Sequence, residues 1–583
     1  MKRRDFLVQS SAVGLSVGLL GGCGGGSTDN EAPTAPAGEA SSPADTSPDS
    51  LATIQTAREQ MPVYQGPNPF LHGVASGDPM ATQVILWTRI SADGLDEIPV
   101  IVEVSRSPDF TDLVYEGIGY ARSQADYTVK IDANLPDPAT TYYYRFDSLG
   151  HKSLTGRTRT TAAASAETDH LRLAVVSCSN LPYGYFNAYQ RIAARPDLDA
   201  VLHLGDYIYE YGEGEYADAS LVDERPIDPP HEIVSLDDYR RRYACYREDP
   251  DLQECHRQHP FICVWDDHEI TNDSWKDGAD NHNPELGEGD FLERKRAAVK
   301  AYFEWMPIRR VDPDDEVRIY RHFEFGQLMS LMMLDTRLAG RDRQVSTSWE
   351  ARDTNRQLLG QSQEQWLFRQ LQNSQSRGAR WHLIGQQIML SPLTLGTLPD
   401  MPNWLVGGGL QLNFDQWDGY EASRRSLLGR IEAMGLDNTV ILTGDIHSSW
   451  AMDVTPDPGN ISKYNRLTGE GSIAVEFVTP AVTSPAAPTK GLSDIAATAL
   501  IPLNRHLKYV DLYHRGYMIL DITQDHCKAD WFHLETITER GSQERFARSY
   551  YTTPGANHLQ RADSPSAPKI SAPALANPKE SLS

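Results

Sequence analysis

The sequence predicts a small all-β domain followed by a larger α/β domain. Residues 68–163 hold short runs of β-branched and aromatic residues between turn residues, with no helical period, which is typical of a β-sandwich. After residue 168, apolar strand-like runs alternate with segments of helical spacing, which is typical of an α/β sheet. The chain of 583 residues is also too long for a single hydrophobic core.

The N-terminal segment 1–23 predicts an export signal. Arg3 and Arg4 precede an apolar stretch at 12–20 that is too short to span a bilayer. The paired arginines resemble a twin-arginine export signal. The Leu-Gly-Gly-Cys run ending at Cys23 resembles a lipoprotein cleavage site, which would make Cys23 the lipidated first residue of the mature protein. The alternative is an ordinary secretory signal with an incidental cysteine.

These two resemblances imply a periplasmic or cell-envelope protein, attached to the membrane only through a lipid on Cys23. Residues 24–67 are rich in Gly, Ser, Thr, Ala and Pro and are expected to form a flexible linker. Such a segment buries too little apolar surface to offset its ordering entropy. Residues 553–583 have a similar composition and are expected to form a disordered tail. The two folded domains are therefore predicted at 68–163 and 168–552.

Within the two domains, individual elements can be assigned from apolar runs and their spacing. Strands of the β domain are expected at 83–90, 98–104, 127–131 and 141–146. Strands of the α/β domain are expected at 171–176, 200–204, 261–265, 328–334, 381–385 and 439–442, with a helix at 186–194.

Composition excludes several classes of function. The net charge of -26 argues against a nucleic-acid-binding platform. It also disfavours phosphate-rich substrates unless metal ions invert the local field. Six cysteines are too few for a disulfide scaffold. No run of about 18 apolar residues follows the N-terminus, so no membrane-spanning helix is expected.

Polar side chains follow the predicted strands of the α/β domain at the point where each strand ends. Functional groups gather at this edge of open α/β sheets. One Asp in such a position is usually a turn residue or a helix cap, but its recurrence at successive strands is harder to explain that way. Carboxylates gathered at one edge would repel each other without cations, so we expect metal ions there. The residues concerned are Cys178, Asp206, Tyr209, Asp267, His268, Asp335, Arg337, Gln387, Asp445 and His447.

Five motifs can be recognised along the chain: Gly73-Val74-Ala75-Ser76-Gly77-Asp78-Pro79, Ser177-Cys178, Gly205-Asp206-Tyr207-Ile208-Tyr209, Trp265-Asp266-Asp267-His268-Glu269 and Gly444-Asp445-x-His447. Their order and spacing resemble the metallophosphoesterase superfamily, and more specifically the PhoD-type alkaline phosphatases. The resemblance runs from about residue 70 to about residue 551. It implies an α/β metallophosphoesterase sandwich with a smaller N-terminal all-β sandwich domain. It also implies hydrolysis of phosphate esters by a metal-activated water at an Fe/Ca centre.

The resemblance assigns an Fe³⁺ site to one part of the cluster. Asp206 would bridge the iron to a second cation, and Cys178, Tyr209 and His447 would bind the iron. The alternative for Cys178 is an inert core residue, since buried cysteines usually behave as small hydrophobes. A turn residue is the alternative for Asp206, and a packed phenol is the alternative for Tyr209.

The resemblance assigns Ca²⁺ to Asp267 and Asp445, and anionic oxygens suit this cation. Asn272 is a further candidate ligand. His268 would contact the phosphate as general acid or hydrogen-bond donor, although an ion-pair role is the alternative. Arg337 would contact the phosphate or the ligands, with structural hydrogen bonding as the alternative.

Two other expectations complete the predicted site. Asp335 and Gln387, like Arg337, would contact the phosphate or the metal ligands, with structural hydrogen bonding as the alternative. Asp445 and His447 are expected on one face of an extended segment, because strand side chains alternate.

The substrate class that follows is a phosphate ester, and monoester or diester preference stays open. The alternative activity is a phosphodiesterase or phospholipase D-type reaction on lipid or polymer phosphodiesters. A lipid-anchored module that only holds Ca²⁺ is a different class of protein. Cys178, Tyr209 and His447 argue against that module, because calcium sites use oxygen ligands of carboxylate and carbonyl type. The oligomeric state is left open by the sequence.

Overall fold

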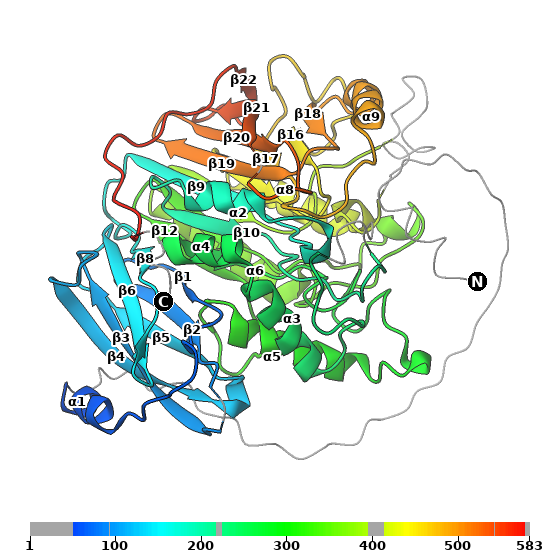
Figure 1. Ribbon diagram of the computed structural model, residues 1–583. Helices are drawn as coiled ribbons and strands as arrows, with labels where there is room; N and C mark the ends of the chain where they lie inside the picture. The colour runs from blue at the N-terminus through cyan, green and yellow to red at the C-terminus, as the bar shows by residue number, and fades with distance from the viewer. Residues whose placement is uncertain (1–50, 93, 217–223, 395–412, 542, 578–583) are drawn as a thin grey trace. The chain divides into compact units, whose positions relative to one another are not determined.

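The computed structural model describes residues 51–92, 94–216, 224–394, 413–541 and 543–577 (Figure 1). The predicted export signal, with Cys23, lies outside the described residues, as does 24–50. None of the helices described is long and apolar enough to cross a membrane.

The described α-helices are α1 (Leu51–Gln60), α2 (Asn187–Ala193), α3 (Leu236–Arg247), α4 (Pro250–Gln258), α5 (Phe291–Trp305), α6 (Gly360–Ser376), α8 (Glu421–Ala433) and α9 (Lys490–Leu503). Short 3₁₀ turns are η2 (Ser123–Ala125), η3 (Leu181–Tyr183), η5 (Pro284–Leu286), η6 (Glu350–Arg352) and η7 (Trp417–Gly419). The strands up to the middle of the chain are β1 (Val74–Gly77), β2 (Gln83–Arg89), β3 (Glu97–Ser105), β4 (Leu113–Arg122), β5 (Thr128–Asn134), β6 (Thr141–Ser148), β7 (His151–Lys152), β8 (Gly156–Arg159), β9 (His170–Val176), β10 (Ala200–His203) and β11 (Pro260–Cys263). The later strands are β12 (Arg321–Phe325), β13 (Met329–Met333), β14 (Trp381–Gly385), β15 (Thr439–Thr443), β16 (Ser449–Val454), β17 (Ala474–Val478), β18 (Leu507–Asp511), β19 (Gly516–Thr523), β20 (Cys527–Leu534), β21 (Glu544–Thr552) and β22 (Gln560–Ala562).

Three sheets organise the described part of the chain. The ten-stranded sheet has the order β22-β21-β20-β19-β9-β10-β11-β1-β2-β5, and β9, β10 and β11 run parallel. The seven-stranded sheet has the order β12-β13-β14-β15-β17-β16-β18, and β13, β14, β15 and β17 run parallel. The five-stranded sheet has the order β4-β3-β6-β7, with β8 on β6.

The two larger sheets pack face to face and form the predicted sandwich. One core cluster contains Val175 and Leu202 of the first sheet together with Leu442 of the second. The neighbouring residue Ile441 belongs instead to a cluster that contains Leu367 of α6. Successive side chains of a strand point to opposite faces, so both faces of β15 are covered. This burial explains why its sequence is a continuous apolar run.

The N-terminal β-sandwich is present, but one of its sheets continues into the sheet of the α/β part. β1 pairs in parallel with β11, where Gly77 lies opposite Phe261. A Cβ on Gly77 would lie 2.1 Å from the backbone oxygen of Pro307 and 2.6 Å from that of Phe261. The junction therefore needs glycine for close backbone approach. The domain boundaries at 68–163 and 168–552 stay predictions.

Part of the segments predicted to lack structure is folded. Within the predicted linker 24–67, α1 is held by Arg58, whose guanidinium lies 2.9 Å from Glu103 and 2.7 Å from Glu116. The predicted disorder is also wrong for 553–577, where β22 pairs with β21. Gln258 Oε1 accepts a 2.9 Å hydrogen bond from the backbone N–H of Ala576. Side chains of distant elements bind the backbone of this tail, and composition does not encode such contacts.

Candidate metal centre

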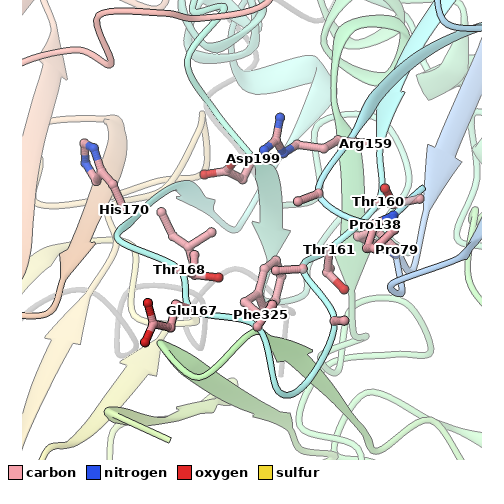
Figure 2. A pocket seen from close by; sticks show the side chains of 15 residues that line it. Pro79, Pro138, Arg159, Thr160, Thr161, Glu167, Thr168, His170, Asp199 and Phe325 are labelled. Atoms are coloured by element: carbon pink, nitrogen blue, oxygen red, sulfur yellow. Dashed lines mark ion pairs between the residues drawn. The ribbon is translucent and has the colours of Figure 1, made fainter.

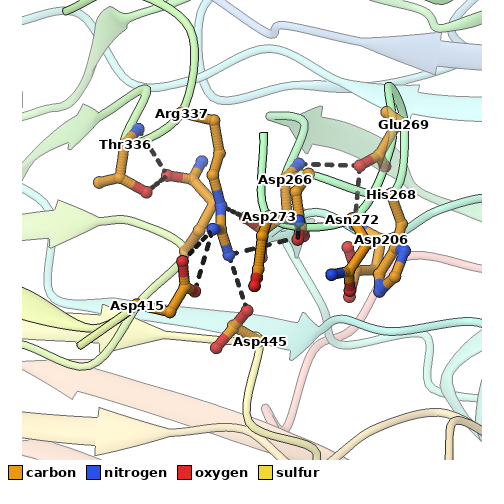
Figure 3. Close-up of polar contacts among 12 residues, drawn as sticks. Asp206, Asp266, His268, Glu269, Asn272, Asp273, Thr336, Arg337, Asp415 and Asp445 are labelled. Carbon is orange, nitrogen blue, oxygen red and sulfur yellow. Dashed lines mark hydrogen bonds and ion pairs between the residues drawn. The ribbon is translucent and has the colours of Figure 1, made fainter. Parts of the chain in front are cut away.

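The carboxyl ends of the parallel strands bring the predicted residues together from both large sheets. Figure 3 shows Asp206, His268, Arg337 and Asp445 among them. Cys178 follows β9, Asp206 follows β10 and Asp267 follows β11. From the other sheet, Arg337 follows β13 and Asp445 follows β15. This convergence fits the general location of sites in open α/β sheets.

Four of the predicted ligands have a left-handed backbone. Their φ angles are 63° at Cys178, 56° at Asp206, 61° at Asp445 and 54° at His447. Non-glycine residues rarely adopt this conformation, which costs roughly 1–3 kcal/mol and concentrates at functional sites. The extended segment expected for Asp445 and His447 is therefore wrong. Both side chains still reach the cluster, because the backbone turns sharply after β15.

The first ligand group contains a sulfur, an imidazole, a phenol and a carboxylate. One donor atom each from Cys178, Asp206 and His447 lies within 4.8 Å of the others. The Tyr209 hydroxyl is 3.1 Å from Asp206 Oδ2 and 3.3 Å from His447 Nε2. His447 Nδ1 is 2.7 Å from the carbonyl oxygen of Pro485. A carbonyl only accepts, so Nδ1 carries the proton and Nε2 offers its lone pair to the group.

The second ligand group consists of carboxylates and the imidazole of His268, and it shares Asp206 with the first group. Donor atoms of Asp206, Asp267 and His268 lie within 4.8 Å of one another, as do those of Asp266, Asp267 and Asp445. Asp206 Oδ1, Asp266 Oδ2 and Asp267 Oδ1 are buried and have no hydrogen-bond partner among the described residues. Buried oxygens of this kind are costly unless a cation binds them, so the residues present fit a metal cluster.

The electrostatics of the cluster also call for added positive charge. Burial raises the pKa of the Cys178 thiol and of the Tyr209 phenol well above their ordinary values, and the Asp206 charge adds to both shifts. Burial raises the pKa of Asp445 to about 6 against the opposing effect of Arg337. At Asp206 burial is outweighed by the charge of His268 and other cationic neighbours, which lower its pKa to about 2. Cations at this site would take the place of the protons.

Arg337 lies at the centre of the carboxylates rather than free for a ligand (Figure 3). Its guanidinium pairs with Asp266, lies 2.9 Å from Asp415 and lies 2.9 Å from Asp445. Gln416 donates a 2.6 Å hydrogen bond to the other oxygen of Asp445. Asp415 and Gln416 were not predicted from the sequence, because they follow no predicted strand. The only local signal was the unassigned Trp-Asp-Gly-Tyr run immediately after them.

His268 is held by the carboxylate of Glu210, to which the sequence analysis assigned no role. Its Nδ1 lies 2.7 Å from Glu210 Oε2, and its ring lies 4.3 Å from the Tyr209 ring. Burial opposes protonation of His268, but the charges of Glu210 and two nearby carboxylates raise its pKa well above the usual value. The structure shows the ion pair with Glu210, whereas the role of His268 as a proton donor stays a prediction. Asn272 donates its backbone N–H to Glu210 Oε1 at 2.7 Å.

Glu269 accepts backbone hydrogen bonds from the segments that follow β10 and β11. Its Oε2 accepts the backbone N–H of Asp206 at 3.0 Å and of Asp266 at 2.8 Å. Its Oε1 accepts the N–H of Tyr207 at 2.5 Å. The carboxylate thus fixes two ligand-bearing turns without itself belonging to a ligand group. Its position in the Asp-Asp-His-Glu motif was the available signal.

Asp335 and Gln387 act on the backbone, as their structural alternatives predicted. Asp335 Oδ1 accepts the N–H of Arg337 at 2.8 Å and of Leu338 at 2.8 Å. Gln387 Oε1 accepts the N–H of Thr336 at 3.0 Å. Together they shape the turn that carries Arg337 into the cluster.

A cavity of about 220 Å³ lies at the opposite end of the strands (Figure 2). His170 and Leu171 begin β9, and Asp199, which immediately precedes β10, pairs with Arg159 at 3.1 Å. Sites in such sheets form at the carboxyl ends, so this cavity is separate from the metal centre.

Comparison with known proteins agrees with this site. Residues 173–531 match the family model described as PhoD-like phosphatase. Residues 55–162 match the PhoD-like phosphatase N-terminal domain. The alkaline phosphatase D of Bacillus subtilis (strain 168) is 35% identical over 491 residues, which cover 81% of this chain and 79% of that protein.

A solved structure described as that of PhoD matches with a TM-score of 0.77 and 33% identity, covering 87% of this chain and 94% of that chain. Its similarity confirms the α/β sandwich with an N-terminal all-β domain. The family consists of metal-dependent phosphatases, so the calcium-binding module is set aside. The chain belongs to the PhoD-like phosphatase family and is a phosphoric ester hydrolase.

Proposed function

We propose that the chain hydrolyses phosphate esters at a centre of Fe³⁺ and Ca²⁺. Cys178, Asp206, Tyr209 and His447 would hold the iron, because thiolate, phenolate and imidazole suit a transition metal. The observation that carries this proposal is the position of Asp206, which belongs both to that group and to a group with Asp267.

The calcium ligands in this proposal are Asp206, Asp267 and Asp445, since hard oxygen donors suit this cation. The unpartnered oxygens of Asp206 and Asp267 support this assignment. When bound, the cations would lower the pKa of a water molecule and polarise the phosphoryl oxygens. His268, held by Glu210, would donate a proton or hydrogen bond to the leaving oxygen.

Elemental analysis of two variants tests the metal assignment. Cys178→Ala should lose iron and keep calcium, whereas Asp267→Asn should lose calcium and keep iron. A calcium chelator should abolish wild-type hydrolysis, and added Ca²⁺ should restore it. Wild-type protein that is fully active without either metal would overturn the proposal. A panel of matched monoesters and diesters then decides between phosphatase and phosphodiesterase preference.

We also propose export by the twin-arginine pathway, with a lipid on Cys23, to the periplasm or cell envelope. The support is the sequence pattern of Arg3, Arg4 and Cys23. Replacing both arginines with lysine should leave folded protein in the cytoplasm. Cys23→Ala should abolish incorporation of labelled lipid. Unchanged export in the first variant, or unchanged labelling in the second, would contradict the corresponding part.

A further inference from the structure

A basic pocket of about 450 Å³ is lined by residues of α9, β18, β20, β21 and β22, and Figure 1 labels these five elements. His533, which lines it, contacts Ser449 Oγ through Nε2 at 3.1 Å, and Ser449 is two residues beyond His447. The pocket is lined mainly by basic side chains, whereas the chain as a whole has a net charge of -26. Its charged lining consists of Lys490, Lys508, Arg545, Arg548 and Arg561 against Asp494 and Asp511.

A β-bulge places two of these arginines on one face. Arg545 and Arg548 are three residues apart and would point to opposite faces of a regular strand. Arg545 lies opposite His533, but Arg548 lies opposite Trp531, and the register shift leaves Ala547 as the extra residue of β21. His533 and Trp531 share a face of β20, so both arginines face the pocket.

The guanidinium of Arg545 is held in place by a hydrogen-bonded chain. Its Nη2 lies 2.9 Å from His514 Nε2, and His514 Nδ1 lies 2.8 Å from Asp511 Oδ2. A guanidinium only donates, so His514 accepts at Nε2 and donates its Nδ1–H to Asp511. In the part of the chain that is described, neither Arg545 nor Arg548 is within ion-pair distance of a carboxylate. No described residue accepts a hydrogen bond from the remaining donors of either guanidinium group, so a ligand could accept from them.

Asp511, His514 and His533 also have donor atoms within 4.8 Å of one another, which alone would suit a cation. Two facts oppose that reading. Arg545 already donates to His514, and two arginines without carboxylate partners repel a cation. The buried Nδ1 of His533 has no described hydrogen-bond partner. If Ser449 Oγ donates to Nε2, Nδ1 carries the proton, and Asp511 Oδ2 lies 3.9 Å from it, beyond hydrogen-bond distance.

We propose that this pocket binds a phosphate-class oxyanion at a site separate from the metal centre. Arg545 and Arg548 would hold it through paired N–H donors, a geometry that guanidinium groups favour for phosphate. The oxyanion can be free phosphate or a second phosphoryl group on a substrate.

Calorimetric titration of the metal-loaded protein with inorganic phosphate tests this site. The Arg545→Gln/Arg548→Gln protein should bind one phosphate fewer than wild type. A matched control is Arg296→Gln/Arg369→Gln, which removes the same charge from exposed residues outside the pocket. This control should keep the wild-type stoichiometry. Equal stoichiometry in all three proteins overturns the proposal, as does loss of a bound divalent metal ion in His533→Gln.

Substrate kinetics separate the two sources of the oxyanion. With a monophosphorylated ester, the Arg545→Gln/Arg548→Gln protein should keep wild-type kcat and KM, which shows that the metal centre is intact. With a bisphosphorylated ester, a KM raised about tenfold or more identifies a second phosphoryl group as the occupant. An unchanged KM, together with the lost phosphate, identifies free phosphate. Loss of kcat on both esters would place the arginines in the metal centre and contradict a separate site.

Discussion

Cys178 is fully buried, follows β9 with a left-handed backbone and offers its sulfur to the same group as Asp206 and His447. A buried thiol with a strongly raised pKa stays protonated unless a cation binds it. Strand exits and motif order were enough to predict this residue from sequence. The same signals predicted Asp206, Tyr209, Asp267, Asp445 and His447, all of which the structure places in or beside the cluster.

The first prediction is that Cys178→Ala loses bound iron, visible absorption and at least about 100-fold in activity. A thiolate or phenolate bound to Fe³⁺ donates charge to the metal, so the loaded protein should be coloured. The unfolding free energy should fall by only about 1 kcal/mol, because a small side chain leaves a small cavity. Cys255→Ala is the matched control, since this buried cysteine belongs to no ligand group described. Wild-type iron and colour in Cys178→Ala would show that Cys178 is a core residue.

The second prediction concerns Glu269, whose two oxygens accept three backbone N–H groups. Glu269→Gln turns one oxygen into an amide donor that faces backbone donors. The unfolding free energy should fall by about 2–4 kcal/mol, and metal affinity should fall with it. Chemical denaturation and metal titration measure these two effects. Glu293→Gln, at an exposed position of α5, should change neither, and equal stability of the two variants would contradict the role given to Glu269.

Residues that hold the predicted site residues in place could not be predicted from the sequence. Asp415 and Gln416 reach the cluster only because the chain returns to Arg337 and Asp445. Glu210 was visible within a motif, but its contact with His268 spans two loops. Such contacts depend on tertiary placement, and no local pattern of the sequence reports them.

At the scale of elements, the parallel strand β17, which carries Glu476 at its centre, was not predicted. The parallel strands β9, β10, β11, β13, β14 and β15 were predicted, because both of their faces are buried. Their sequences are continuous apolar runs, as in β15. β4 and β21 were not predicted. β21 has the sequence ERFARSYYT, in which charged, aromatic and small residues alternate irregularly around a bulge. The parallel joint between β1 and β11 was also missed, because it pairs strands from the two predicted domains.

The third prediction tests that joint. In Gly77→Ala the new Cβ would meet backbone oxygens of Pro307 and Phe261, which cannot rotate away. The unfolding free energy should fall by about 3 kcal/mol, the upper range for overpacking. Gly429→Ala is the control, because a Cβ there meets nothing within 4 Å inside α8. The control should gain up to about 1 kcal/mol from helix propensity. Urea denaturation of both variants measures the contrast, and a Gly77→Ala protein as stable as wild type would contradict the close joint.

At the scale of the whole molecule, acid stability depends on carboxylates held by cationic partners. Asp521 of β19 lies 2.8 Å from His170 Nε2 and 3.1 Å from His526 Nε2. Burial opposes ionisation, but these hydrogen bonds and the charge of Arg172 lower the pKa of Asp521 well below its usual value. Its stabilising effect is therefore complete above the unfolded pKa of about 3.9 and is lost as pH falls through the folded pKa.

The fourth prediction follows from the lowered pKa of Asp521. Asp521→Asn should be about 2 kcal/mol less stable than wild type at pH 7. The difference should shrink steadily below about pH 4, because the wild-type carboxylate becomes protonated. Denaturation curves at a series of pH values measure it. A difference that stays constant down to pH 2 would assign the loss to packing instead of charge.

The order of strands in the ten-stranded sheet also constrains when the protein can acquire its native form. β9, which leads to Cys178, has β19 as one of its two neighbours, and Leu173 pairs with Leu520. A ribosome adds about 5–20 residues per second, so the nascent chain waits tens of seconds with this edge of β9 unpaired. Pairings so distant along the chain also slow folding itself. The loop that carries Cys178 thus gains its full support only after nearly the whole polypeptide has been synthesised, so we expect a metal ion held by Cys178 to enter after translation.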